Sequence, residues 1–145
     1  MQLDFWQLSR DPVERVVALI AERTRGGGEK LLVVSEDESQ RAAVSRALWE
    51  GKPEAFLTNG EADAPHAERQ PILLSATSAA VNGARYLVIA DGTWREGAET
   101  FERVFLLFGD AGTETARGTW RQFDGREDVE RSYYAQENGK WVKKA

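Results

Sequence analysis

Short runs of apolar residues alternate along the chain with segments in which apolar residues recur at helical spacing. Residues 3–8 and 30–34 form runs of strand length, and between them apolar side chains recur every three or four positions from Val13 to Ala21. A second segment with helical spacing, residues 42–48, follows the second run. The order strand, helix, strand, helix predicts an α/β protein built on a parallel sheet.

The first helix carries signals at both of its ends. Asp11 followed by Pro12 predicts a capping side chain and a proline at the first helical position. Glycines 26–28 predict the end of that helix, because glycine readily adopts the left-handed conformation that terminates helices. The strand at residues 30–34 is apolar throughout, which is typical of a strand covered on both faces.

Three more apolar runs predict strands at residues 72–74, 86–90 and 104–108. The last of them is the final clear strand by this criterion. Residues 58–70 are polar and contain glycine and proline, so they are predicted to form a loop.

The remainder of the chain has no further apolar run. Residues 113–136 are predicted to be mostly helical, with an interruption at 123–125. Asn138 and Gly139 form a turn signal, and residues 140–144 then read as a short tail. The chain shows no repeat and no low-complexity segment, and we expect one domain spanning residues 1–145.

Composition and charge narrow the possible partners. The chain has no cysteine, no apolar run near the roughly 20 residues of a membrane span, and no signal-peptide pattern at its start. We therefore expect a cytoplasmic protein without disulfides or membrane contact. The net charge of −5 argues against strong binding to bare duplex DNA. The acidic excess lies before Arg103, so an anionic partner should meet the C-terminal third.

Motifs for nucleotide and hydrolytic chemistry are missing. Glycines 26–28 precede a strand, whereas a phosphate-binding loop follows a strand and opens a helix. His66 is the only histidine and lies in a polar loop, where a solvated side chain is the simpler interpretation. A single histidine in a chain without cysteine makes a zinc site improbable. We expect no cofactor, no metal and no catalytic residues.

The acidic loop after the second strand leaves an alternative open. Its carboxylates at residues 36–38 could hold Mg²⁺ in a nucleotide- or metal-dependent enzyme. Carboxylates at a helix start also satisfy its unpaired N–H groups, which we favour. Two pairs here have the spacing of a capping box, Ser35 with Glu38 and Asp37 with Gln40.

Aromatic and basic residues offer binding chemistry instead. Trp49 ends a predicted helix and is either a core plug or an exposed anchor. Arg117, Trp120 and Arg121 share one helix face through i, i+3, i+4 spacing. They form either a solvated amphipathic helix or a cationic, aromatic-lined pocket for an acidic peptide with an apolar end.

Several segments together resemble one protein family. Residues 31–40 combine an apolar strand with an E-D-E-x-Q helix start, and a terminal Leu48-Trp49 and a short spacer to Phe56-Leu57 follow. In order and spacing this resembles the chi subunit of bacterial DNA polymerase III. Further segments of the chain match the same family pattern: 71–74, 82–85, 101–104 and 116–121 ahead of Tyr133-Tyr134.

The resemblance implies a fold and a role. It implies a Rossmann-like, three-layer α/β fold, in which helices flank a mostly parallel central sheet without nucleotide chemistry. It implies a non-catalytic subunit of the clamp-loader assembly that binds the acidic C-terminal tail of single-stranded DNA-binding protein. It further implies contact with a psi subunit in many bacteria, and with DNA only indirectly.

The resemblance also assigns residues to these two partners. The implied tail-binding residues are Arg117, Trp120, Arg121 and Phe108. The implied psi-facing residues are Trp49, Pro53 and Phe56.

Overall fold

A computed structural model describes residues 1–51 and 57–145 of the chain. Within these residues eight strands form one sheet in the order β3-β4-β2-β5-β6-β1-β7-β8. The strands are β1 (Gln2–Gln7), β2 (Leu31–Val34), β3 (Asn59–Glu61), β4 (Ile72–Ser75), β5 (Tyr86–Ile89), β6 (Arg103–Phe108), β7 (Glu130–Glu137) and β8 (Lys140–Lys143). The helices are α1 (Val13–Gly26), α2 (Glu38–Glu50) and α3 (Thr113–Gln122), with short 3₁₀ turns η2 (Ala67–Arg69), η3 (Ala98–Thr100) and η4 (Asp110–Gly112).

The sheet is parallel except at one edge. β1 pairs with both β6 and β7, so that Gln2 lies opposite Arg103 on one side and Glu130 on the other. Only β8 runs antiparallel, as the second strand of a hairpin with β7. In the part of the chain that is described, no helix combines the length and apolar character needed to cross a bilayer.

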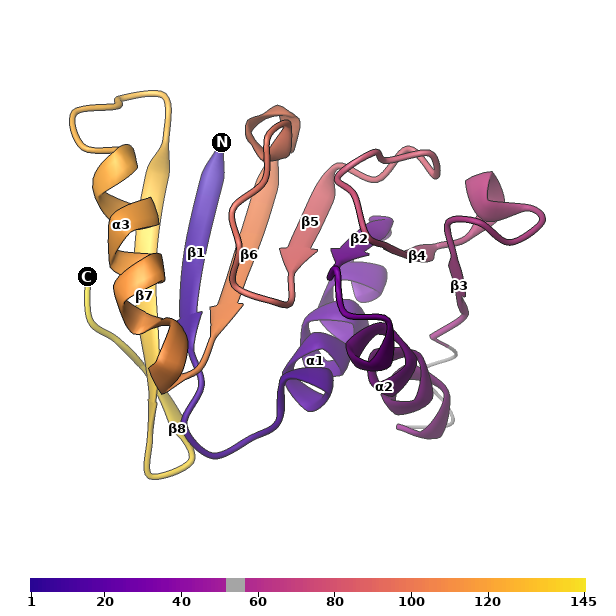
Figure 1. Cartoon of the computed structure of the whole chain (residues 1–145), viewed down its shortest axis with the longest axis horizontal. Coiled ribbons are helices and arrows are strands. Elements are labelled where there is room, and N and C mark those ends of the chain that lie inside the picture. Colours follow the sequence, from indigo (N-terminus) through magenta and orange to yellow (C-terminus); the bar gives the residue numbers. More distant parts are fainter. Residues whose placement is uncertain (52–56) are drawn as a thin grey trace.

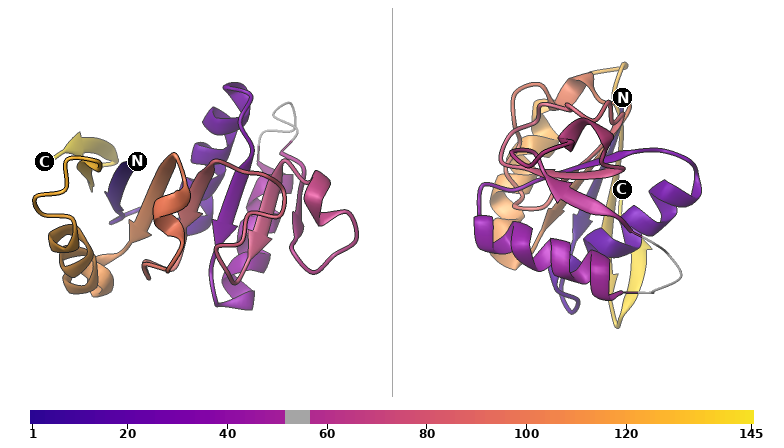
Figure 2. Two further views of the ribbon diagram at one scale, coloured as in Figure 1. Left: turned by 90° about the horizontal axis from the view of Figure 1, so that it is seen from above. Right: turned by 90° about the vertical axis from the view of Figure 1, so that its right-hand side faces the viewer.

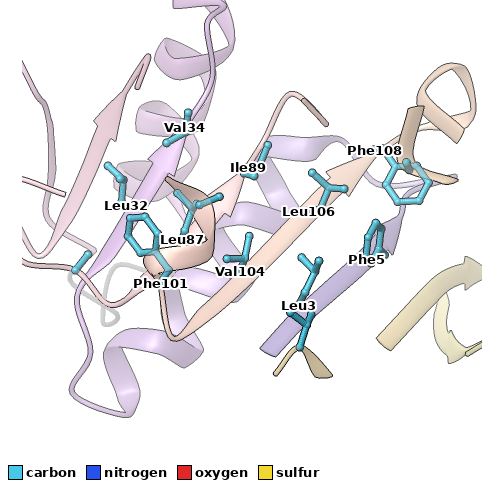
Figure 3. Close-up of a cluster of buried hydrophobic side chains, with 14 of the residues drawn as sticks. Leu3, Phe5, Leu32, Val34, Leu87, Ile89, Phe101, Val104, Leu106 and Phe108 are labelled. Carbon is cyan, nitrogen blue, oxygen red and sulfur yellow. The ribbon is translucent and has the colours of Figure 1, made fainter. Parts of the chain in front are cut away.

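Separate cores cover the two faces of this sheet. Side chains of α1 and α2 pack on one face, over residues such as Leu31, Val88 and Leu107. The 3₁₀ turn η3 and helix α3 cover the other face, where Phe5 and Leu106 lie in the centre (Figure 3). Helix α3 lies with β7 and β8 at one end of the molecule, far from β3 and β4 (Figures 1 and 2). The predicted Rossmann-like α/β fold with a mostly parallel sheet is confirmed.

The loop between β1 and α1 corrects the predicted first cap. The helix begins at Val13, Pro12 occupies the capping position, and Asp11 makes no capping bond. A side chain from β7 organises this loop instead: Gln136 Oε1 accepts hydrogen bonds from the backbone N–H groups of Ser9, Arg10 and Asp11 at 3.0–3.3 Å. Gln136 Nε2 donates to the Asp11 carboxylate at 2.8 Å. Asp11 is therefore held by a distant strand rather than by its own helix.

The start of α2 follows the second of the two predicted capping pairs. The Asp37 carboxylate accepts hydrogen bonds from the N–H groups of Ser39 and Gln40 at 2.9 and 3.3 Å. The Gln40 side chain does not return to the cap. It accepts from the Ser35 hydroxyl at 2.5 Å and donates to the carbonyl of Ala90, the residue that follows β5.

Replacing Asp37 with alanine should lower the free energy of unfolding by about 1 kcal/mol, because two N–H groups of α2 lose their acceptor. Urea denaturation followed by circular dichroism measures this change. Asp37→Asn is the matched control, since asparagine caps helices nearly as well as aspartate. Equal losses in both variants would contradict the capping role.

The C-terminal part of the chain differs most from the sequence prediction. Helix α3 ends at Gln122, and the segment predicted to continue it forms β7, while the predicted tail forms β8. The hydrophobic pattern did not predict β7 because its two buried side chains, Ser132 and Gln136, are polar. The turn signal at Asn138-Gly139 is confirmed, with φ values of 52° and 78° that suit a tight hairpin turn. The polar loop at 58–70 also contains the short edge strand β3.

Candidate functional site

A hollow of about 560 Å³ lies between residues of α3, β7 and the end of the chain. Figure 1 shows α3, β7 and the C-terminus at the same end of the molecule. Three of its side chains come from α3: Arg117, Trp120 and Arg121. The others come from β1 and the loop after it, from β7, and from the residues after β8: Gln7, Ser9, Tyr133, Ala135, Gln136, Glu137, Lys144 and Ala145. We call this hollow the α3 cleft.

Trp120 forms a fixed aromatic wall of the α3 cleft. Its ring packs edge-on against Phe5 of β1 at 5.1 Å and against Tyr133 of β7 at 6.0 Å between centroids. The Arg131 guanidinium lies 4.3 Å from the centre of the same ring. Arg131 also donates to the Trp120 carbonyl and pairs with Asp124 at 2.9 Å. These contacts join the end of α3 to β7 and fix the indole in place.

The cations of the α3 cleft are open to solvent. The Arg117 side chain is 59% exposed, and its ion-pair partner at 3.1 Å, Glu114, is 82% exposed. A pair this exposed contributes little free energy, so Arg117 can exchange Glu114 for another anion. No ion pair is seen for Arg121 in the described part of the chain. Lys144 adds a third cation, paired with Glu137.

Tyr133 adds a hydroxyl to the aromatic wall. It donates a hydrogen bond to Gln7 Oε1 at 2.8 Å. Burial raises the pKa of the Tyr133 phenol, although the charge of Arg117 acts in the opposite direction. Tyr133 therefore stays protonated at neutral pH and keeps this donor. Phe108 lies behind it, edge-on at 5.8 Å and buried in the core, so it supports the wall without lining the cleft.

Comparison with known families identifies the chain. A family model for the DNA polymerase III chi subunit, HolC, matches residues 1–128. The chain belongs to this family. No protein with a curated description matches it. Membership in the chi family gives the protein an accessory role in DNA replication, in association with the DNA polymerase III complex.

The chi family model ends two residues before β7, yet part of the α3 cleft lies beyond that point. Tyr133 and Lys144 belong to this later segment. Sequence reasoning assigned neither residue to the cleft, because it treated 113–136 as mostly helical and 140–144 as a short tail. The usable signal was alternation: in a strand, Tyr133, Ala135 and Glu137 point to the same face, and all three line the cleft.

The residues assigned to the psi contact are only partly visible. Trp49, at the end of α2, is 56% exposed. It is therefore an exposed side chain and not a core residue. Pro53 and Phe56 lie outside the described residues. A hollow of about 280 Å³ separates the start of α1 from the end of α2; its lining includes Arg15, Ala47 and Glu50 and does not include Trp49.

Residues of the acidic loop after β2 make structural hydrogen bonds in this chi-family chain. Asp37 caps α2, and the N–H of Glu36 donates to Asp91 at 3.0 Å. Burial would raise the pKa of Asp91, but hydrogen bonds from Arg95 and two backbone N–H groups lower it, so a carboxylate occupies this end of the sheet. Among the described residues, no three His, Cys, Asp or Glu side chains gather as metal ligands. The capping contact of Asp37 agrees with the structural interpretation of this loop.

Proposed function

We propose that this chi-family protein is a non-catalytic subunit that binds the acidic C-terminal tail of single-stranded DNA-binding protein in the α3 cleft. It thereby links the clamp-loader assembly of DNA polymerase III to the protein that coats single-stranded DNA. The observation that carries the proposal is the open hollow beside Arg117, with Trp120 as its wall.

The chemistry of the α3 cleft matches such a ligand. Arg117 and Arg121 offer planar guanidinium groups that suit the carboxylates of an acidic peptide. The rings of Trp120 and Tyr133 offer an apolar surface for an aromatic residue at the peptide's end. Charge then supplies steering and orientation, and ring burial supplies much of the affinity.

Calorimetric titration with a short acidic peptide ending in an aromatic residue tests the proposal. The control peptide carries amides in place of its acidic side chains. We expect saturable binding of the acidic peptide, weaker binding of the amide peptide, and affinity that falls as salt is raised. Equal affinity for both peptides would contradict the electrostatic part. Thermal stabilisation by ATP or NAD with Mg²⁺, without peptide binding, would favour the enzyme alternative.

Arg131 should act on tail binding through Trp120, because its guanidinium stacks on that ring and bonds its carbonyl. We expect Arg131→Gln to weaken binding of the acidic peptide by roughly 1 kcal/mol, about fivefold. The salt dependence of binding should stay as in the original protein, because Arg131 is not among the cleft-lining residues. The matched control, Arg126→Gln, removes an equal charge that pairs with Glu99 and Asp128 instead. A reduced salt dependence in Arg131→Gln would indicate direct contact with the peptide.

We also propose that the exposed end of α2 receives a psi subunit, which connects the protein to the clamp loader. An exposed tryptophan at the end of a helix is a suitable anchor for a protein partner. Trp49→Ser should abolish co-purification of a co-expressed psi subunit and leave the affinity for the tail peptide unchanged. Loss of both interactions would indicate a general folding defect.

A further inference from the structure

A second hollow, of about 360 Å³, lies on the sheet face opposite the α3 cleft. It is bounded by the last turns of α1 and by the strands β1, β5 and β6. Its lining residues are Trp6, Ile20, Arg23, Thr24, Gly27, Glu29, Tyr86, Arg103 and Phe105. We call it the α1 pocket. Its volume is in the range of small-molecule sites and suits one ring with a short substituent.

Aromatic rings form the rigid side of the α1 pocket. Trp6 and Phe105, on the neighbouring strands β1 and β6, meet edge-on at 6.3 Å between centroids. Both are more than nine-tenths buried. Trp141 of β8 packs on Trp6 at 4.7 Å, which holds the indole in position. Tyr86 at the start of β5 adds a partly buried third ring.

Arg103 is held in the α1 pocket by a fully buried carboxylate. Asp4 has no exposed surface, and its Oδ2 accepts from Nε and Nη2 of Arg103 at 3.1 and 2.7 Å. The guanidinium also lies 4.6 Å from the centre of the Phe105 ring. Its third nitrogen, Nη1, makes no hydrogen bond within the described residues. Arg103 is therefore a preorganised cation with a free donor edge.

The indole N–H of Trp6 is a further donor without an acceptor. It is buried, and no described residue accepts its hydrogen bond. Oδ1 of Asp4, two positions earlier on the same face of β1, likewise has no donor. A buried polar group without a partner is costly and needs an explanation. An acceptor atom on a molecule in the α1 pocket would provide the partner that Trp6 lacks.

The charges around the α1 pocket favour an anion. Arg23 is exposed and has no ion pair in the part of the chain that is described. The one acidic lining residue, Glu29, is engaged by Arg85 through two hydrogen bonds of 3.1 and 2.6 Å, which lower the pKa of its carboxyl group. Glu29 therefore already has a cation of its own in Arg85. Among the described residues, no carboxylate pairs with Arg23 or with Nη1 of Arg103.

We propose that the α1 pocket binds a small aromatic anion, a single ring that bears a carboxylate or a phosphate. The ring packs against Phe105 and Tyr86, the anionic group meets Arg103 and Arg23, and an acceptor atom takes the Trp6 N–H. This site is separate from the α3 cleft, because the two lie on opposite faces of the sheet and share no lining residue.

Nuclear magnetic resonance of the tryptophan indole N–H groups tests this site on the full chain. Trp6 and Trp120 report on the two hollows separately, and the spectrum of Trp6→Phe identifies the Trp6 signal. The probes are phenylacetate, phenyl phosphate and, as a neutral control, benzyl alcohol. We expect saturable movement of the Trp6 signal with one or both anions, which also distinguishes carboxylate from phosphate. Benzyl alcohol should bind roughly tenfold more weakly.

A second variant keeps the test decisive if Trp6→Phe folds poorly. Arg23→Gln changes an exposed side chain and should weaken the anion roughly fivefold without altering the spectrum of the free protein. Sequential assignment then identifies the Trp6 signal in the original chain. The proposal is overturned if that signal does not move, if it moves equally with benzyl alcohol, or if only the Trp120 signal responds.

Discussion

Arg117→Ala should weaken binding of the acidic tail peptide by about 2 kcal/mol, roughly thirtyfold. Arg117 is the cleft cation whose own partner, Glu114, is almost fully exposed, so the guanidinium can turn to a peptide carboxylate at little cost. Its loss removes a charge-assisted contact that alanine cannot replace. Calorimetric titration at constant salt measures the change directly.

Glu114→Gln is the matched control for this prediction. It removes the same ion pair from the opposite side and leaves Arg117 in place. We expect tail affinity in this variant to stay unchanged or to rise slightly, because a competing carboxylate is gone. The model of the α3 cleft fails if Arg117→Ala binds the peptide as tightly as the original chain does.

Phe5→Ala should lower the free energy of unfolding by about 3–5 kcal/mol. Phe5 is completely buried on β1, in contact with Trp120 at 5.1 Å and stacked with Tyr133 at 6.2 Å. Alanine would leave a cavity directly beneath the aromatic wall of the α3 cleft. Chemical denaturation measures the stability loss.

Two comparisons separate the loss of side-chain packing at Phe5 from general unfolding of the protein. Phe5→Leu should cost clearly less, because leucine refills much of the volume. In conditions where both variants are folded, Phe5→Ala should also bind the tail peptide more weakly than Phe5→Leu, since Trp120 loses its support. A stability loss under about 1 kcal/mol would contradict the central position assigned to this ring.

The sequence predicted the strands that are buried on both faces and missed those that are not. β2 reads Leu31–Val34 and is completely buried, so its apolar run was decisive. β7 lies near the edge of the sheet, where Ser132 and Gln136 occupy the buried positions. Gln136 is there because its amide serves the backbone of the β1–α1 loop. The hydrophobic pattern cannot reveal a strand whose buried side chains are polar and form hydrogen bonds.

Sequence spacing predicted the helical half of the α3 cleft, and the other half depends on tertiary structure. Arg117, Trp120 and Arg121 line it together, as i, i+3, i+4 spacing on one helix requires. Tyr133 and Lys144 join them only because β7 pairs with β1 and the chain then turns back. The pairing of β7 with β1 has no local signature, and Asn138-Gly139 signals only the turn between β7 and β8. Pro53 and Phe56, assigned to the psi contact, lie outside the described residues and stay predictions.

The position of β1 between β6 and β7 has a consequence for biosynthesis. β1 leaves the ribosome about a hundred residues or more before its neighbours, which begin at Arg103 and Glu130. Until then its buried side chains, with Phe5 on one face of the strand and Trp6 on the other, have no permanent cover. Such distant pairing slows folding, and we expect nascent chains that stop short of β7 to depend on chaperones and to aggregate when released early.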